Sequence, residues 1–352
     1  MASITQTAGS MRQRFGVSPI LRKALGSQES VLLLVLMLLI AYVYHENARF
    51  LDTRNAASLL SGYAYIAIAA IGMSMVIITG NIDISVGSLM VTLSMLSGAL
   101  SVWNGYPSWM SLDGIIAIAW IMPIIVGALV GAIIGFFVTY LRIPAIVVTL
   151  GFMSILKGLL IIVSGGDRII NMPKGYALAQ IRPLESVSLP FFERFFQTLT
   201  MPIFFMIVLT ILAALWMRYS ATGRALYAVG GNAEAARLSG IAQHRIVMTA
   251  FILNGIFVGI AAVMNATQFS VIQVTLPPIE LLIITATVVG GVSILGGTGT
   301  VIGAMLAAIL LNTITKALVF LDISPFWTRA IQGLLILITV LADLYRRRRQ
   351  SA

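Results

Sequence analysis

A short segment, TGNIDISVGS, places one carboxylate between two long apolar runs at Asp83. A carboxylate at membrane depth is costly, so such an acid normally faces the interior of a helix bundle or a water-filled path. The glycine and polar residues around it are typical of a broken helix whose freed backbone groups need polar partners. These residues are Gly80, Asn81, Ser85 and Gly87. We expect them, with Asp83, to form a hinge beside a pathway, at its cytoplasmic mouth. A plain turn between two spans and direct contact with a transported solute are the alternatives.

A second segment, GRALYAVGGNAEAARLSGI, has the pattern of a short surface helix. Asn232 is suited to cap it, Glu234 lies in its first turn beside Ala235 and Ala236, Arg237 follows three residues later, and Gly240 is suited to end it. Two turns of helix are not stable alone in water, so they need a partner. That partner is either the rest of the chain or another protein, and an ordinary connecting loop is the alternative.

A third segment, TVVGGVSILGGTGTVIGAML, is rich in glycine but lacks the Gly-Lys-Ser or Gly-Lys-Thr of a phosphate-binding loop. By this criterion the chain does not hydrolyse ATP itself, and active transport would draw on a partner or an ion gradient. The chain has no cysteine and two histidines, which excludes thiol chemistry and argues against a histidine metal site. We therefore expect no cofactor. Lys157, inside an apolar run, is expected to snorkel or to form an internal ion pair.

The elements that must position these segments are membrane helices. The chain of 352 residues is 59% hydrophobic and 10% charged, which indicates an all-α, polytopic transmembrane bundle. The net charge of +10 does not suggest nucleic acid, because the basic residues stand at the ends of apolar runs. Apolar runs predict about ten spans, with eight to ten as the range, near 31–44, 59–79, 86–103, 114–140, 145–164, 201–217, 247–267, 281–295, 300–316 and 327–344.

The distribution of lysine and arginine predicts that both termini are cytoplasmic. We expect a cytoplasmic N-terminal segment (1–30), a transmembrane domain (31–345) and a basic tail (346–352) that meets anionic lipid headgroups. Within the transmembrane domain, residues 165–200 form an external loop and residues 219–243 a cytoplasmic loop. No segment is long enough for a separate soluble domain.

Small residues repeat every fourth position in two of the predicted spans. Gly127, Gly131 and Gly135 share one face, and Gly299 and Gly303 continue to Ala307 in another. This spacing lets helix backbones approach closely in lipid, so we expect tight helix packing at both places.

Together the segments GNIDISVGS, GGNAEAARLSG and GGVSILGGTGTVIGA resemble the permease subunits of bacterial ABC importers for ribose, arabinose, xylose and related monosaccharides. The resemblance covers roughly residues 59–340. It implies a subunit that pairs with a second copy or a sister permease, takes a sugar from a periplasmic binding protein, and is driven by cytoplasmic ATPase subunits. In such importers the coupling loop has the signature that Glu234, Ala235, Ala236 and Gly240 match here, which implies ATPase docking on this segment. The family usually has Gly-Gly where this chain has Gly80-Asn81.

The rival hypothesis is an ion-coupled secondary carrier, in which Asp83 would be a cation or proton site. The sequence leaves the solute open among pentoses, rhamnose, other hexoses, polyols and a sugar-like signalling molecule. It also leaves open whether the second permease is identical.

Overall fold

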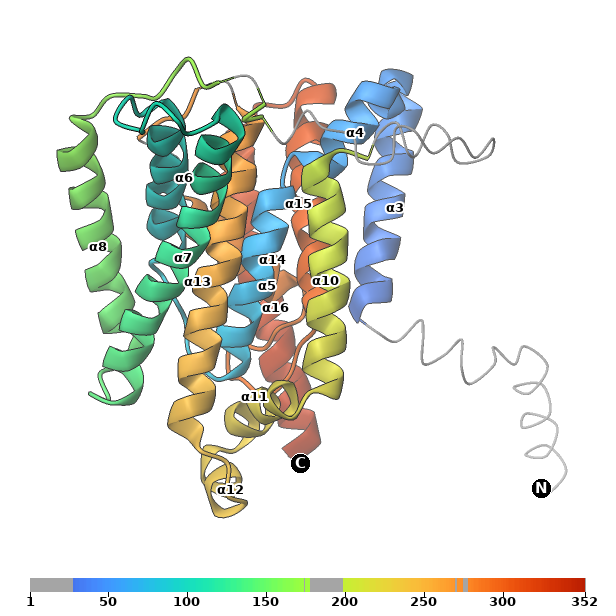
Figure 1. Ribbon diagram of the computed structural model, residues 1–352. Coiled ribbons are helices and arrows are strands. Elements are labelled where there is room, and N and C mark those ends of the chain that lie inside the picture. Colours follow the sequence, from blue (N-terminus) through green and yellow to red (C-terminus); the bar gives the residue numbers. More distant parts are fainter. Residues whose placement is uncertain (1–27, 174, 178–198, 270, 275–277, 352) are drawn as a thin grey trace, which may run out of the picture.

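The computed structural model describes residues 28–351 except 174, 178–198, 270 and 275–277 (Figure 1). The helices in chain order are α3 (Gln28–Glu46), η1 (Ala48–Leu51), α4 (Thr53–Ser61), α5 (Ala64–Ile78), α6 (Val86–Val102), α7 (Leu112–Thr139), α8 (Ala145–Ser164), α10 (Met201–Tyr219), α11 (Ala221–Gly231), α12 (Ala233–Leu238), α13 (Gln243–Gln268), α14 (Ile279–Val289), α15 (Val301–Phe320) and α16 (Trp327–Ser351). Apart from one isolated β-bridge, between Ile169 and Ile272, the described residues contain no strand pairing. The all-α bundle predicted from composition is confirmed.

Eight helical segments of the described chain are long and apolar enough to cross a membrane. They are α3, the continuous α4–α5 segment, α7, α8, α10, α13, α15 and α16. The apolar helices α6 and α14 are shorter, with 17 and 11 residues. At about 1.5 Å per residue, α14 is only about 16 Å long, roughly half of the hydrocarbon thickness. The predicted range of eight to ten spans is therefore confirmed, but the expected span 281–295 was too long, because α14 ends at Val289.

The core lies along α5 and α13, which stand in the middle of the bundle (Figure 1). Every residue of α5 is buried except Tyr65. By contrast, α3, α8 and α16 lie at the periphery and expose large apolar side chains. Since a lipid-facing surface has to be apolar, these outer helices supply the face toward the acyl chains.

A glycine seam joins α7 to α13. A Cβ on Gly131 would meet the backbone of Phe251, 3.1 Å from its carbonyl carbon, and one on Gly135 would lie 2.8 Å from Met248 Sδ. Gly127 faces Gly255, where a Cβ on Gly255 would lie 2.7 Å from the Gly127 carbonyl carbon. The two backbones are therefore in direct contact, and a larger side chain at these positions would force the helices apart.

The bundle has two distinct ends. Helices α11 and α12 project at one end, called here the α12 end, and the end of α16 lies there too (Figure 1). The first residue of α3, Gln28, lines a pocket together with Asp343 of α16, so the two ends of the described chain share this side, as predicted. The other end is called the outer end. It carries the described part of the external loop, where Ile169 pairs with Ile272.

Some predicted segments fall partly outside the described residues: 1–27 of the N-terminal segment and 178–198 of the external loop. In the predicted basic tail, the backbone continues α16 as a helix as far as Ser351.

Candidate functional site: two helix breaks joined to a projecting helix pair

The first break, residues 79–85, separates α5 from α6. Gly80 has a φ of +81°, a conformation that costs a residue with a side chain more than it costs glycine. Its N–H donates to Ile77 O at 2.8 Å, and the N–H of Asn81 donates to Val76 O at 3.3 Å. With the bonds from Thr79 to the same carbonyl groups, they pair the last carbonyls of α5. The helix therefore ends at Ile78 with Thr79 as its C-cap, within one residue of the end of the predicted span 59–79.

Asp83 anchors the first break to α13. The carboxylate is 2% exposed and accepts three hydrogen bonds: from Ser85 N–H at 2.9 Å, from Ser85 Oγ at 2.5 Å, and from Asn254 Nδ2 at 2.8 Å. Asn254 is the twelfth of the 26 residues of α13, so this contact lies near the middle of that helix. Asp83 therefore contacts the interior of the bundle, and its expected role as a hinge beside a pathway stays a prediction. Because extended backbone advances about 3.3 Å per residue, residues 79–83 carry the carboxylate from the end of α5 deep into the bundle.

A second buried acid, Glu280, was missed by the sequence reasoning. It lies in the first turn of α14, and its Oε1 is 3.1 Å from Lys157 Nζ of α8. A Cβ on Gly87, in the first turn of α6, would lie 2.6 Å from the backbone nitrogen of Glu280. The N-termini of the two short helices therefore meet inside the bundle, where their partial positive charge favours nearby carboxylates. Lys157 forms the internal ion pair that was one of its two expected roles.

The second break, residues 290–300, separates α14 from α15. Gly291 ends α14 with a φ of +98°, and its N–H donates to Val288 O at 2.9 Å. Gly303, one turn into α15, packs against the same place: a Cβ there would lie 3.0 Å from the Gly290 carbonyl carbon. Gly299 is held against Val292, with 2.6 Å from its would-be Cβ to Val292 Cα. Gly299 lies in the second break and Gly303 in the first turn of α15, and both pack against the end of α14 and the residues that follow it.

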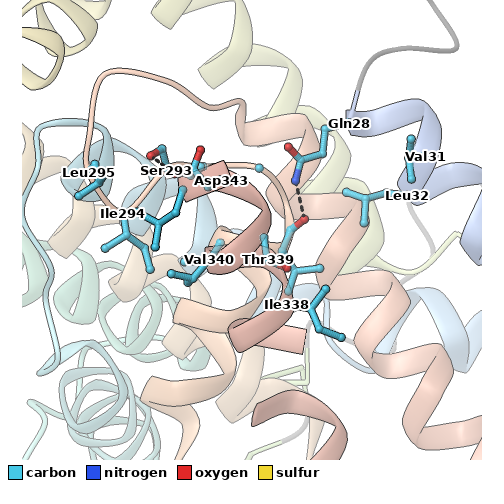
Figure 2. A pocket seen from close by; sticks show the side chains of 15 residues that line it. Gln28, Val31, Leu32, Ser293, Ile294, Leu295, Ile338, Thr339, Val340 and Asp343 are labelled. Atoms are coloured by element: carbon cyan, nitrogen blue, oxygen red, sulfur yellow. Dashed lines mark hydrogen bonds between the residues drawn. The ribbon is translucent and has the colours of Figure 1, made fainter. Parts of the chain in front are cut away.

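The second break also forms one wall of a pocket of about 430 Å³ between α3 and α16. Figure 2 shows the amide of Gln28 over the end of α14 and Ser293 beside Asp343. Gln28 Nε2 donates to Val289 O at 3.2 Å, and Ser293 Oγ donates to Asp343 Oδ2 at 2.5 Å. The rest of the lining is mainly apolar. The side chains of Gln28 and Ser293 are therefore already hydrogen-bonded to other parts of the protein.

Helix α11 touches both breaks. Gly230 lies so close to the first break that a Cβ there would collide with Ile78 O, and it would also lie 2.7 Å from Gly297 N of the second break. The N–H of Gly297 itself donates to Ile78 O at 2.9 Å. Tyr227, one turn earlier in α11, donates its hydroxyl to Gly299 O at 3.0 Å. A displacement of α11 would therefore also displace the end of α5 and the second break.

Helix α12 continues from α11 and projects from the bundle (Figure 1). The side chain of Asn232 accepts from Ala235 N–H at 2.9 Å, and the N–H of Gly240 donates to Arg237 O at 3.0 Å. Of the apolar residues in this helix, Ala236 is buried, Ala235 is exposed and Leu238 is 76% exposed. The helix thus faces outward with an apolar side chain that nothing in the described chain covers.

A charged pair completes the exposed surface of α12. Arg237 bonds Glu234 through two nitrogens, at 2.6 Å and 3.1 Å, and both side chains are 65% exposed. The hydrogen bonds from Arg237 lower the pKa of Glu234 below its usual value, so this carboxylate is ionised at neutral pH. The exposed pair contributes little to folding stability. Its orientation is better suited to contact with a partner than to holding the bundle together.

Comparison with known proteins agrees with this architecture. Residues 55–340 match the family described as branched-chain amino acid transport system / permease component. The chain belongs to this permease family. It is 34% identical over 320 residues to the autoinducer 2 import system permease protein LsrC of Yersinia enterocolitica, covering 90% of this chain and 82% of the relative. The LsrC of Yersinia pseudotuberculosis (strain IP 31758) is 33% identical over 320 residues, covering 90% and 85%. No solved structure matches the chain.

These matches confirm the resemblance drawn from the three motifs. The chain is a membrane-embedded ABC importer permease of the monosaccharide type, and the ATPase of such a system is a separate subunit. In general, such a permease works with an ATPase and a solute-binding protein.

The three sequence motifs lie close together in the structure. The first break and the second break meet at the Gly297–Ile78 bond, and the GGNAEAARLSG segment reaches both through Gly230. Sequence reasoning missed Asn254, Tyr227 and Glu280. Of these, only Glu280 had a signal, since it is an acid within the apolar run that becomes α14.

Proposed function

We propose that this chain is the permease subunit of an ATP-driven importer in the bacterial inner membrane, with the α12 end in the cytoplasm. It moves a monosaccharide or a related small polar solute that a periplasmic binding protein delivers at the outer end. It works with cytoplasmic ATPase subunits and with a second permease, which is either another copy or a sister chain. The basic tail meets anionic lipid headgroups on the cytoplasmic side.

One observation carries the proposal: a single helix, α11, contacts both helix breaks while its continuation, α12, projects from the bundle. An ATPase that binds α12 and moves it would move Gly230 and Tyr227. Those two residues in turn touch Ile78, Gly297 and Gly299 at the ends of α5 and of the second break. Motion of this kind would reach α6 and α14, whose first turns meet inside the bundle.

Docking on α12 involves Asn232, Glu234, Ala235, Ala236, Arg237 and Gly240 in two different ways. Asn232 and Gly240 fix the beginning and end of the helix, and Ala236 anchors it to the bundle. Glu234, Ala235 and Arg237 face outward, together with Leu238. A groove on the ATPase would thus receive an apolar side chain flanked by an ion pair.

Reversing the charge at Glu234 tests the docking assignment. In the complex of permease, ATPase and binding protein, Glu234→Lys breaks the pair with Arg237 and puts two positive charges side by side. We expect the ATPase to be recovered less well on co-purification, and solute-stimulated ATP hydrolysis to fall about tenfold, which corresponds to about 1.4 kcal/mol.

The control is Asp167→Lys, a charge reversal on an exposed loop at the outer end. It should leave ATPase recovery unchanged. Normal recovery and hydrolysis with Glu234→Lys would contradict the docking assignment.

The proposed class of solute is based on the names of the similar permeases. Two permeases that are 33–34% identical are named for autoinducer 2 import, so autoinducer 2 joins pentoses and deoxyhexoses as a candidate cargo. Uptake by the reconstituted complex should be measured for autoinducer 2, D-ribose, D-xylose and L-rhamnose. Uptake of at least one, dependent on ATP, is the expected result.

The rival secondary carrier requires Asp83 to be free for a cation or proton. Its carboxylate already accepts three hydrogen bonds from Ser85 and Asn254, and the described residues contain no cluster of three or more potential metal ligands. Both facts favour Asp83 as an anchor of the first break. Uptake that stops when ion gradients collapse while ATP persists would favour the carrier instead.

A further inference from the structure

A cavity at the outer end differs in chemistry from the pocket beside α16 at the α12 end. It has a volume of about 430 Å³ and lies among the outer ends of α5, α13 and α15 and the beginnings of α14 and α16. We call it the outer chamber and define it by the aromatic rings of Tyr63, Tyr65 and Phe269 and the polar side chains of Asn265, Thr328 and Gln332. A smaller hollow of about 170 Å³ shares Asn265 and Phe269 with it.

Some polar groups in the outer chamber are hydrogen-bonded, such as Tyr63 to Thr315, but two have no partner among the described residues. Asn265 is 5% exposed, and its amide makes no hydrogen bond within the described part of the chain. The hydroxyl of Thr328 is buried without a partner as well. A buried polar group left unsatisfied costs about 1–3 kcal/mol, and such groups in native proteins generally bind water or a ligand. In the pocket at the α12 end, by contrast, Gln28 bonds Val289 and Ser293 bonds Asp343 (Figure 2).

Tyr65 also lines the outer chamber. It is the one residue of α5 that is not buried, although both of its neighbours along the helix, Ala64 and Ile66, are fully covered. Its ring packs edge-to-face against Tyr63 with 6.5 Å between centroids. Tyr65 of α5, its N-cap Tyr63 and Asn265 of α13 therefore line one chamber, although about two hundred residues separate the tyrosines from the asparagine in the sequence.

The lining indicates the kind of molecule that fits. Among the described lining residues Arg329 is the sole charged side chain, and it is exposed. Hydroxyls and amides both donate and accept hydrogen bonds, and aromatic rings offer apolar faces. Such a surface complements a neutral molecule with several hydroxyl groups and C–H faces, and a cavity of this size lies within the range of small-molecule sites.

The chamber is also connected to the helix breaks. Residues Ile279, Leu281 and Leu282 of α14 form part of its wall, and Glu280 between them packs on Gly87. The far end of the same helix leads into the second break, which Tyr227 and Gly230 of α11 contact. Movement of α14 would therefore change the shape of the chamber.

We propose that the outer chamber is where the permease itself binds the solute, a neutral polyhydroxylated small molecule, with Asn265 and Tyr65 as hydrogen-bonding contacts. This rests on the proposed importer function and adds to it a solute site that the sequence did not reveal. The chamber then selects among solutes in addition to the binding protein.

Introduced thiols test whether the chamber contains water. The native chain has no cysteine, so Asn265→Cys and Gln332→Cys each create a single reactive thiol. A charged methanethiosulfonate reagent reacts with the thiolate, which forms in water and not in lipid. In the full complex we expect both variants to react and to lose uptake on labelling. Leu334→Cys on the exposed apolar face of α16 is the matched control and should stay unlabelled.

Uptake kinetics test whether the chamber binds solute. Asn265→Leu should reduce uptake about tenfold, mainly by raising KM, because a loss of about 1.4 kcal/mol of binding corresponds to that factor. Asn265→Gln retains an amide and should be less impaired. The panel solute that the wild-type complex takes up should slow the labelling of Gln332→Cys.

Two outcomes would overturn the site. Labelling of Asn265→Cys no faster than that of Leu334→Cys would mean that lipid or a second permease fills the chamber. Normal KM in Asn265→Leu would mean that solute passes elsewhere. Failure of the importer proposal looks different, since the wild-type complex would then take up none of the four panel solutes with ATP, whatever the labelling shows.

Discussion

Both helix breaks interrupt the helical hydrogen bonding of the backbone inside the bundle, and different contacts stabilise each of them. In the first break, side chains replace the lost helical hydrogen bonds, with Asp83 accepting from Ser85 and from Asn254 of another helix. In the second break, glycines let backbone pack directly on backbone, as at Gly303 against Gly290. A break closed by a buried carboxylate is held at one position, because moving it would strand charge and donors in an apolar interior. The carboxylate bonded to the second break, Asp343 beside Ser293, is only half-buried, so a displacement there strands less charge.

This difference leads us to expect different mechanical roles for the two breaks. We expect the first break to act as a fixed anchor in the middle of the bundle, and the second to be the part that α11 moves. Both meet at the α12 end through the bond from Gly297 N–H to Ile78 O. Three substitutions test this comparison, in order of decreasing expected effect.

Removing the anchor should have the largest effect. Asp83→Ala leaves the two donors of Ser85 and the amide of Asn254 without an acceptor, at about 1–3 kcal/mol for each buried group. We expect the thermal midpoint of the detergent-solubilised protein to fall by several degrees, measured by size-exclusion chromatography after heating, and uptake to be lost.

Asp83→Asn is the conservative variant. It keeps an acceptor for Ser85, and rotation of the Asn254 amide would turn its unpartnered oxygen toward the new NH₂ group. Its midpoint should lie clearly above that of Asp83→Ala. Equal destabilisation by both would mean that charge, not hydrogen bonding, holds the first break.

Separating α11 from the two breaks should impair coupling more than folding. In Gly230→Ala the new Cβ collides with Ile78 O and lies 2.7 Å from Gly297 N, so α11 must shift. We expect the ATPase to bind normally while the number of solute molecules moved per ATP falls roughly tenfold, a loss of about 1.4 kcal/mol of coupling.

The neighbouring glycine provides the control. A Cβ on Gly231 would have no atom within 4 Å, so Gly231→Ala should couple normally and gain slightly in helix stability. Equal coupling in the two variants would show that α11 does not transmit motion to the breaks.

Loss of one hydrogen bond to the second break should have the smallest effect. Tyr227→Phe removes the bond to Gly299 O and is expected to lower the free energy of unfolding by about 0.5–1.5 kcal/mol. Thermal midpoints can be compared with those of Tyr219→Phe, an exposed tyrosine near the start of α11. A larger loss for Tyr227→Phe than for Asp83→Ala would reverse the assignment of anchor and mobile break.

The sequence by itself determined the helix bundle, the range of spans and the family. The bundle and the number of spans follow from apolar run length and from the charge at helix ends, whereas the family follows from the resemblance of three motifs. The cap of α12 at Asn232 and its end at Gly240 could be read in the same way, because a cap involves residues only a few positions apart.

Only the tertiary structure decided where the first break lies and what it contacts. Hydropathy does not distinguish a turn at the surface from a segment that re-enters the bundle, and the structure places the Asp83 contact at the middle of α13. Its partner Asn254 lies 171 positions away, and Lys157 lies 123 positions from Glu280. Likewise Tyr65, Asn265 and Thr328 show no common pattern in the sequence. They form one chamber because α5 packs on α13 and α14, and α14 packs in turn on α16. Which faces of packed helices meet depends on the fit of the whole bundle.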